Sequence, residues 1–350
     1  MKTILAVENK EEWAKNLALC ESWDVYHTAD YAMLETTPGQ TAYLFFHSDG
    51  DKHGALPFIV RQLKEIPWCN EDGFDAISAY GYPGPICNSA ARQSPEFLRE
   101  FSSCLRDALI GLNVASLFVR LHPILSEPTM LGDAVEFVGP TVFLDLTLPE
   151  DEQRRQTRKT HRNELRRLQR AGVSIVEDRD FLRLEEFIGL YDSRMHALGA
   201  ANSYFFSKDY YAGLCSLPND AVKLVHAVEG DDIVASAFFL ISPDGIQYHL
   251  SATRSDYVRF SPARIVIEHM RDWGIRNSRK WIHLGGGVGS REDSLFFFKS
   301  GFSKLRAEFH VAKIVPDASK YERLCMERER VAPRSSDTAD SEFFPAYRAR

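Results

Sequence analysis

The sequence predicts an α/β protein built from two similar halves. Three observations support this prediction: a strand hairpin occurs twice along the chain, each hairpin is followed by a helix that starts at a Ser-Pro pair, and each helix leads to an apolar strand. The chain has 350 residues, of which 44% are hydrophobic and 26% are charged, so it is long enough and apolar enough for two globular domains.

The first half begins with a predicted hairpin of strands at 42–47 and 54–61, joined by an acidic turn that contains a glycine. The Ser-Pro pair at 94–95 then starts a helix, because Ser is a favourable N-cap and Pro has no N–H group to lose at the first helical position. An apolar strand at 116–120 follows.

The second half repeats this order. Strands at 223–228 and 233–241 form the predicted hairpin, and a third strand runs through 248–250. The Ser-Pro pair at 261–262 is predicted to start the helix, and an apolar strand follows at 280–284. The repeat indicates a duplicated α/β unit.

The predicted domains are residues 1–147, residues 148–320 and a C-terminal tail at 321–350. The first boundary follows an apolar strand end, after which the composition becomes charged. From residue 331 the tail is polar and is expected to be mobile, with an aromatic pair at 343–344 available for docking.

A basic helix is predicted over 154–171. It holds eight Arg or Lys residues and a single acid between Arg154 and Arg170, although the whole chain has a formal charge of −7. At helical spacing its arginines lie along one side. Two interpretations stay open: a solvated helix that faces acidic loops, or a phosphate or RNA contact. In the second interpretation the phosphate is held by Arg158, Arg162 and Arg166.

A glycine-rich segment follows the last predicted strand. Gly285, Gly286 and Gly287 permit a close backbone approach, but the segment has neither the Walker A pattern nor G-x-G-x-x-G. Lys299 follows three phenylalanines, so an apolar environment is expected to lower its pKa and leave it able to stabilise a carbonyl or a phosphate. The alternative is an ordinary edge lysine. His249, in a strand, is either a base or a structural histidine.

Further polar residues are candidates for lining a substrate pocket. In the first half they are Arg120 and His122 at a strand end and Tyr82 in a Gly/Pro-rich aromatic loop, although ordinary turn chemistry also explains that loop. In the second half they are Tyr204 and Arg254.

The six cysteines include no C-x-x-C pair and no Cys/His cluster at metal-ligand spacing, so neither a metal site nor a disulfide framework is expected. No apolar run is long enough for a membrane span, and a cytoplasmic location is predicted.

The segment 284–302 resembles the signature of the Fem-like family of the GNAT superfamily. The resembling parts are a glycine run after a strand, then Glu-Asp-Ser-Leu, then Phe298-Lys299-Ser-Gly-Phe. Further similarity is carried by the segments 23–31, 80–85 and 158–173, and the resemblance extends over roughly residues 20 to 315 in family order.

The resemblance implies tandem GNAT-like domains, each with a mixed, mostly antiparallel sheet flanked by helices. It also implies an N-acyltransferase that forms an amide bond by moving an amino acid from aminoacyl-tRNA to an amine, such as that of a peptidoglycan precursor or a natural-product intermediate. Phe298 and Lys299 match the family's Phe-Lys pair, which is associated with the transfer centre, and the chemistry would lie mainly in the second domain. No cofactor is expected.

The donor is indicated by a departure from ordinary GNAT enzymes, which bind the pyrophosphate of coenzyme A on backbone amides of R/Q-x-x-G-x-G/A at a helix start. The equivalent segment, 259–263, has no glycine and contains Pro262, which lacks an N–H group. This departure favours charged tRNA over coenzyme A as the partner. The negative net charge of the chain argues against a tRNA partner. The alternatives are an acetyl-CoA-dependent (or other acyl-CoA-dependent) N-acetyltransferase of a small amine, and a non-catalytic tandem domain that binds RNA or nucleotide.

Overall fold

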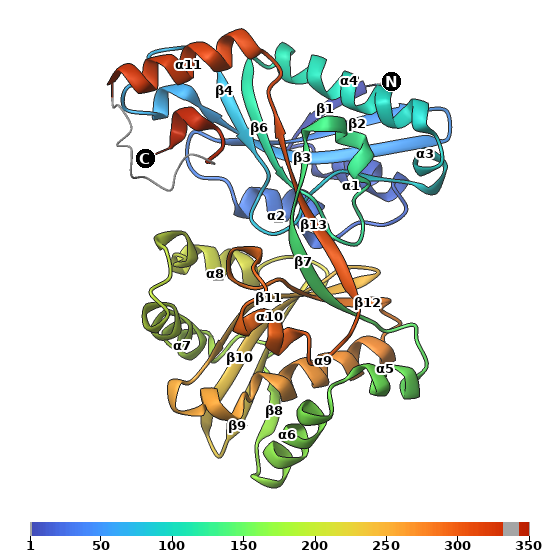
Figure 1. The fold of residues 1–350 in the computed structure, drawn as a ribbon, viewed down its shortest axis with the longest axis vertical. Helices are drawn as coiled ribbons and strands as arrows, with labels where there is room; N and C mark the ends of the chain where they lie inside the picture. The colour runs from blue at the N-terminus through green and yellow to red at the C-terminus, as the bar shows by residue number, and fades with distance from the viewer. Residues whose placement is uncertain (1, 332–342, 350) are drawn as a thin grey trace. The chain divides into compact units, whose positions relative to one another are not determined.

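The computed structural model describes residues 2–331 and 343–349. Two compact units account for them: unit 1 comes from residues 1–138 and 309–350, and unit 2 from residues 139–308 (Figure 1). The chain passes between the units twice, within β7 (Val135–Asp145) and within β13 (Arg306–Ile314). This division differs from the predicted boundaries at 147/148 and 320/321, because unit 1 also contains the C-terminal part of the chain.

The sheet of unit 1 is mixed and mostly antiparallel. β4 and β6 are parallel, since helix α4 (Pro95–Gly111) lies in the connection between them, and the other pairs are antiparallel. β13 closes this sheet by pairing antiparallel with β6 through Val311–Ile314. The other strands are β1 (Lys2–Ala6), β2 (Thr41–Asp49), β3 (Lys52–Gln62), β4 (Phe74–Ile77), β5 (Ile86–Cys87) and β6 (Val114–Arg120).

The sheet of unit 2 repeats this plan. β11 and β12 are parallel and are connected by helix α9 (Ala263–Arg276), and the other pairs are antiparallel. β7 closes this sheet by pairing antiparallel with β12 through residues 142–145. The predicted duplication is therefore confirmed, with the closing strands exchanged between the two halves of the sequence. The other strands are β8 (Ser174–Glu177), β9 (Val222–Glu229), β10 (Asp232–Ile241), β11 (Gly245–Thr253) and β12 (Trp281–Gly285).

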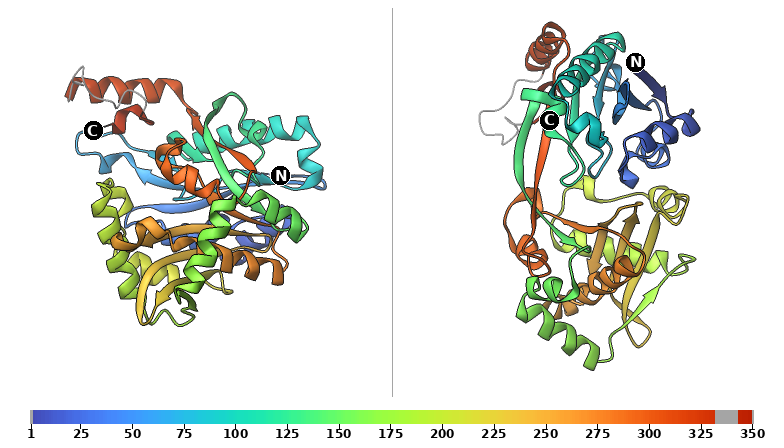
Figure 2. Two further views of the ribbon diagram at one scale, coloured as in Figure 1. Left: turned by 60° about the horizontal axis from the view of Figure 1, so that its bottom comes forward. Right: turned by 90° about the vertical axis from the view of Figure 1, so that its right-hand side faces the viewer.

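Helices cover both sheets, and the two views in Figure 2 show α4 along the sheet of unit 1 and α6 beside α9 in unit 2. Among the described residues, no helix has the length and apolarity that crossing a bilayer requires. Unit 1 has α1 (Lys10–Leu19), α2 (Ala29–Leu34), α3 (Ser89–Arg92), α4 (Pro95–Gly111) and α11 (Ala318–Val331). Unit 2 has α5 (Glu150–Gln156), α6 (Lys159–Arg170), α7 (Leu184–Ala197), α8 (Lys208–Cys215), α9 (Ala263–Arg276) and α10 (Ser294–Lys299).

The two Ser-Pro pairs behave differently. Ser94 caps α4 as predicted, because its Oγ accepts a hydrogen bond of 3.3 Å from the backbone N–H of Phe97. Ser261 does not cap α9, so that prediction is wrong. Its backbone is left-handed, with φ of 48°, and its Oγ donates back to the Val258 carbonyl, so the residue closes the preceding 3₁₀ turn and Pro262 takes the N-cap position.

The C-terminal segment 343–349 packs against unit 1. Tyr347 is fully buried, and its hydroxyl lies 2.7 Å from the Ser116 Oγ. Arg348 forms an ion pair with the buried Asp75, and the ring of Phe344 stacks on Tyr321. The predicted docking is therefore confirmed for Phe344, whereas Phe343 is half exposed. Residues 332–342 lie outside the described part of the chain.

Candidate acyl-transfer site

The glycine loop after β12 is held by one carboxylate. Asp293 accepts hydrogen bonds from the backbone N–H groups of Val288, at 3.0 Å, and of Phe296, at 2.9 Å. Burial raises the pKa of Asp293, but the hydrogen bonds from these N–H groups lower it by more than burial raises it. The pKa of Asp293 therefore lies below its ordinary value. A β-carbon at Gly287 would come within 2.3 Å of the Asp293 carboxylate, so this closure requires glycine there. Gly285 has a φ of 76°, which also favours glycine.

Lys299 contacts the same loop. It is the last residue of α10, and its Nζ donates a 2.7 Å hydrogen bond to the carbonyl of Gly286. The residue is only 8% exposed, and this burial lowers its pKa from 10.5 to about 8, while Asp293 acts in the opposite direction. The predicted desolvation is confirmed. Its ammonium is therefore a hydrogen-bond donor that loses its proton at a much lower pH than an exposed lysine.

Each of the three phenylalanines before Lys299 carries an arginine on its ring. The guanidinium carbon of Arg158 lies 3.9 Å from the ring centroid of Phe297. The corresponding distance is 5.2 Å for Arg306 and Phe296, and 5.5 Å for Arg264 and Phe298. Over residues 2–331 and 343–349, none of these three arginines forms an ion pair with an acid. The segment thus gathers three guanidinium groups that have no ion-pair partner among the described residues, although Glu164 acts on Arg264 and Glu292 acts on Arg306 from a greater distance.

His161 of α6 lies under this group. Its ring packs against Phe298 and Phe302, with centroids 5.7 and 4.8 Å away. Burial, and then the charges of Arg264 and Arg158, lower its pKa to about 3, so the imidazole is neutral. The buried residues of α6 are His161, Leu165 and Leu168, which form a narrow seam on the inner side of the helix.

The three arginines predicted to hold phosphate are not together. Arg158 joins the group described above, but Arg162 donates to the backbone carbonyls of Arg154 and Thr157, and Arg166 lies on the exposed face of α6. The partners that the structure gives Arg158 are Arg264 from α9 and Arg306 from β13. Sequence reasoning missed both, because each lies over 100 residues away along the chain and no spacing links them.

The other predicted residues of unit 2 have separate surroundings. The Nε2 of His249 lies 3.1 Å from the hydroxyl of Tyr210. Arg254 forms ion pairs with Asp232 and Asp256, at 3.1 and 2.9 Å. Tyr204 is 38% exposed in a short 3₁₀ turn. Within the described residues no hydrogen bond or ion pair joins these side chains to Lys299.

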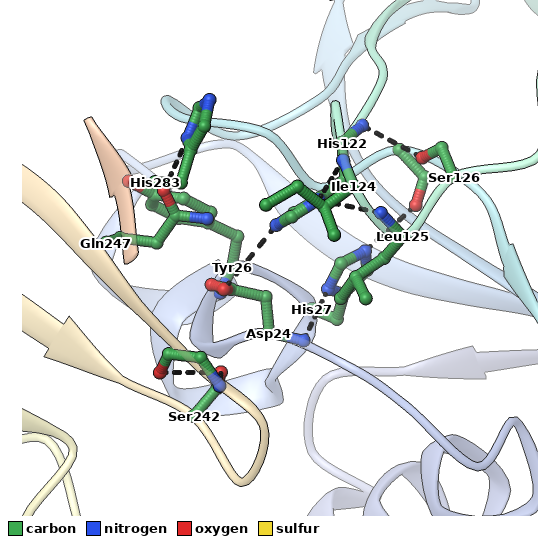
Figure 3. A network of polar contacts seen from close by, with 12 residues as sticks. Asp24, Tyr26, His27, His122, Ile124, Leu125, Ser126, Ser242, Gln247 and His283 are labelled. Carbon is green, nitrogen blue, oxygen red and sulfur yellow. Dashed lines mark hydrogen bonds and ion pairs between the residues drawn. The ribbon is translucent and has the colours of Figure 1, made fainter. Parts of the chain in front are cut away.

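Unit 1 contains a buried polar network built around Asp24 and His122 (Figure 3). The Nδ1 of His122 accepts the backbone N–H groups of Ile124 and Leu125, at 3.1 and 3.0 Å, which places the ring proton on Nε2. That Nε2 lies 3.5 Å from the Asp24 carboxylate. Burial raises the pKa of Asp24, but the hydrogen bonds from His122 and from the backbone N–H of Tyr26 offset this effect and hold the pKa below its ordinary value.

His27 connects this network to the aromatic loop. Its Nδ1 accepts the N–H of Asp24 at 3.0 Å, so its Nε2 donates to the carbonyl of Gly84 at 2.9 Å. Burial lowers the pKa of His27 to about 4, and the ring is neutral. Tyr82 of the same loop contacts His122 edge-on, with centroids 6.4 Å apart.

The structure therefore brings Tyr82 and His122 together, and adds Asp24 and His27, which sequence reasoning did not name as site residues. The signal for both lay in the segment 23–31. Arg120 instead lies over the ring of Phe118, at 5.3 Å.

Comparison with known proteins gives the same superfamily. Residues 155–293 match a family model described as an acetyltransferase (GNAT) domain. No curated protein matches the sequence.

Several solved structures share the fold over most of the chain. FemX superposes with a TM-score of 0.65 at 11% identity, covering 89% of this chain and 96% of that one. The C-terminal domain (DUF2156) of a putative lysylphosphatidylglycerol synthetase from Agrobacterium fabrum has a TM-score of 0.53 at 14% identity, covering 91% and 95%. L-PGS from Bacillus licheniformis has a TM-score of 0.50 at 13% identity, covering 90% and 95%. Residues 155–293 therefore form a GNAT acetyltransferase domain, and the chain as a whole has a fold similar to that of FemX.

Proposed function

We propose that the protein transfers an aminoacyl group from aminoacyl-tRNA to an amine acceptor and forms an amide. The observation that carries this proposal is the group formed by Arg158, Arg264 and Arg306, whose charges no acid pairs within the described chain. Closely placed like charges repel, so a ligand rich in phosphate groups is the natural counterpart of this surface. Phe297, 65% exposed beneath Arg158, adds an aromatic ring on which a base can stack.

The start of α9 supports a donor other than coenzyme A. Pro262 has no N–H group, and the N–H groups of Arg264 and Ile265 already donate to the carbonyls of Ser261 and Pro262, both at 3.0 Å. A pyrophosphate at this helix start would therefore find few free backbone donors. The name of one similar structure, a putative lysylphosphatidylglycerol synthetase, is that of an enzyme whose product carries a lysyl group.

The chemistry is attack of the acceptor nitrogen on the ester carbonyl carbon of the charged tRNA. A C–N bond forms, the ester C–O bond breaks, and the proton that the amine loses ends on the released tRNA hydroxyl. In this proposal Lys299 donates to the oxyanion that develops on the carbonyl oxygen, beside the close backbone approach that Gly285 to Gly287 permit. The amine's proton leaves through the substrate itself or through His249. Phe298 supports this centre by packing against His161.

The acceptor in this proposal is a small-molecule or peptide amine, and its proposed contacts include Tyr82 and His122. The ring of Tyr82 contacts His122 edge-on, and hydrogen bonds with the backbone determine which ring nitrogen of His122 and of His27 carries the proton. Arg120, Tyr204 and Arg254 remain proposed substrate contacts.

The test is filter binding of mixed charged tRNA to the purified protein at several salt concentrations, together with a thermal-shift assay with acetyl-CoA. The triple variant Arg158→Gln/Arg264→Gln/Arg306→Gln is expected to bind more weakly, and its slope of log affinity against log salt should fall by about 2 to 3. Arg276→Gln, an exposed position in the last turn of α9, is the matched control and should leave the slope unchanged.

Two outcomes would replace the proposal. A rise in melting temperature with acetyl-CoA, without retention of charged tRNA, would indicate an acetyl-CoA-dependent N-acetyltransferase. Retention of tRNA that survives Lys299→Ala, with no transfer to any amine offered, would indicate a non-catalytic RNA-binding protein.

A further inference from the structure

A cluster of three metal-ligating side chains lies in unit 1, outside the site described above. His47 comes from β2, and Glu100 and Cys104 come from α4. Their ligand atoms all lie within 4.8 Å of one another. Glu100 and Cys104 are four residues apart, so the helix presents them one above the other on a single face. The strand and the helix are held together here by the contact of the His47 ring with Phe97, at 5.1 Å.

His47 is the central feature of the cluster. It is only 2% exposed, yet neither of its ring nitrogens forms a hydrogen bond within the described chain. Its Nε2 lies 3.5 Å from the carboxylate of Glu100. Leaving a buried polar atom without a partner costs free energy, so such atoms normally have a hydrogen-bond partner. Burial also lowers the pKa of His47, which keeps the ring neutral with a free lone pair.

We propose that His47, Glu100 and Cys104 bind one Zn²⁺ ion. An imidazole nitrogen and a thiolate are ligands that Zn²⁺ accepts and that Ca²⁺ and Mg²⁺, which take oxygen ligands, do not. Three protein ligands leave the fourth tetrahedral position to water. On binding, the S–H bond of Cys104 breaks and its proton passes to the solvent, whereas the neutral imidazole and the ionised carboxylate bind without losing a proton.

The present geometry is close to that of a bound site. Bond lengths of about 2.0–2.3 Å to zinc place tetrahedral ligand atoms roughly 3.3–3.8 Å apart. The cluster therefore has to contract by only about 1 Å. Glu100 can supply this movement by a side-chain rotation, because its side chain is 50% exposed. The charge of Lys2 acts on both His47 and Cys104, but Lys2 also pairs with Asp107 at 3.4 Å, so its repulsion of a bound cation is reduced.

No spacing in the sequence predicts this site, since His47 lies far before Glu100 along the chain and the only local pair is Glu100 with Cys104. Contact between β2 and α4 is needed to complete it.

The experiment is a Co²⁺ titration of the full chain after dialysis against a chelator, followed by competition with Zn²⁺. We expect one ion per chain, a thiolate-to-cobalt charge-transfer absorption, and intense visible bands typical of tetrahedral cobalt, all lost when Zn²⁺ displaces the probe. Calorimetry in two buffers of different ionisation enthalpy should show release of about one proton per Zn²⁺ bound.

Cys104→Ser should abolish the charge-transfer band, and Glu100→Gln should weaken Zn²⁺ binding by roughly 100-fold or more, since even outer partners of metal ligands are worth about 10–100-fold. Cys215→Ser, a partly buried cysteine of unit 2, is the matched control and should bind as the unaltered chain does. His47→Gln should also weaken Zn²⁺ binding. Because the Glu100 side chain is half exposed, Glu100→Gln is expected to fold and to test the site even if His47→Gln does not fold. The absence of saturable binding, or a charge-transfer band that persists in Cys104→Ser, would overturn the proposal.

Discussion

Gly301 lies so close to His161 that a β-carbon at position 301 would come within 1.9 Å of the imidazole Cε1. The ring has little freedom to move away, because Phe298 and Phe302 pack against it. The backbone of Gly301 also accepts the N–H of Arg158 at 2.8 Å, which joins the start of α6 to the end of α10. The glycine of the Phe-Lys-Ser-Gly-Phe sequence is therefore required by the helix that supports the site.

Gly301→Ala is expected to lower the free energy of unfolding by about 1–3 kcal/mol, because the added methyl group overpacks a site that cannot relax. Urea unfolding measures this change. Gly189→Ala is the matched control, since a β-carbon there meets nothing within 4 Å, and as a replacement in a helix it should stabilise by about 0.5–1 kcal/mol. Equal effects of the two substitutions would contradict the steric explanation.

The sequence predicted what depends on neighbours along the chain. The turn at 48–51, the hairpins and the Ser94 cap follow local rules, and all are found. The desolvation of Lys299 was also predictable, because Phe296 to Phe298 directly precede it. The closing strands β7 and β13 were not predicted, because strand pairing between distant segments leaves no local pattern.

The same limit explains the arginines of the site. Arg158 was found because it lies in a run of basic residues, whereas Arg264 and Arg306 are single arginines whose significance appears only when α9 and β13 meet α10. At Ser261 a local pattern gave a wrong prediction. A Ser-Pro pair predicts a helix start, but the preceding 3₁₀ turn forces Ser261 into a left-handed backbone in which its hydroxyl cannot cap.

Ser94→Ala should destabilise unit 1 by about 1 kcal/mol, because it removes the acceptor for the N–H of Phe97. Ser261→Ala should lack this capping cost, and Ser261→Gly should stabilise the protein by up to about 1 kcal/mol, since glycine tolerates a φ of 48° that other residues rarely adopt. Thermal unfolding of the three variants tests this contrast. A stability loss in Ser261→Gly as large as that in Ser94→Ala would show that Ser261 acts as a cap after all.

Lys299 should make stability depend on pH in a defined window. The folded pKa is about 8 and the ordinary value, which applies to the unfolded chain, is 10.5. Between these values the unfolded chain binds a proton that the folded chain has released, so stability rises with pH. Below pH 8 both states are protonated, and the cost of burying the charge is present in full.

The measurement is the free energy of unfolding of the unaltered protein minus that of Lys299→Met, followed from pH 7 to pH 10.5. The difference should be flat at the lower end and should increase above pH 8, because methionine has no proton to exchange. Lys159→Met, at an exposed position on α6, should show no such rise. A difference that stays constant over the whole range would mean that Lys299 keeps its ordinary pKa in the folded protein.

Asp293 is expected to hold the glycine loop in place, since it is the acceptor for both Val288 and Phe296. Asp293→Ala should speed hydrogen exchange at these two amides and lower stability by more than the roughly 1 kcal/mol that loss of a single cap costs. Asp317→Ala is the control, because Asp317 accepts one backbone N–H, that of Lys320, near the start of α11.

The pKa of Asp293 is below its ordinary value, so the stabilisation that Asp293 contributes is present at neutral pH and is lost as the pH falls through that lowered pKa. If exchange at Val288 were unchanged in Asp293→Ala, the carboxylate would be only a helix cap, and the loop beneath Lys299 would owe its shape to its glycines and to the Gly286 contact alone.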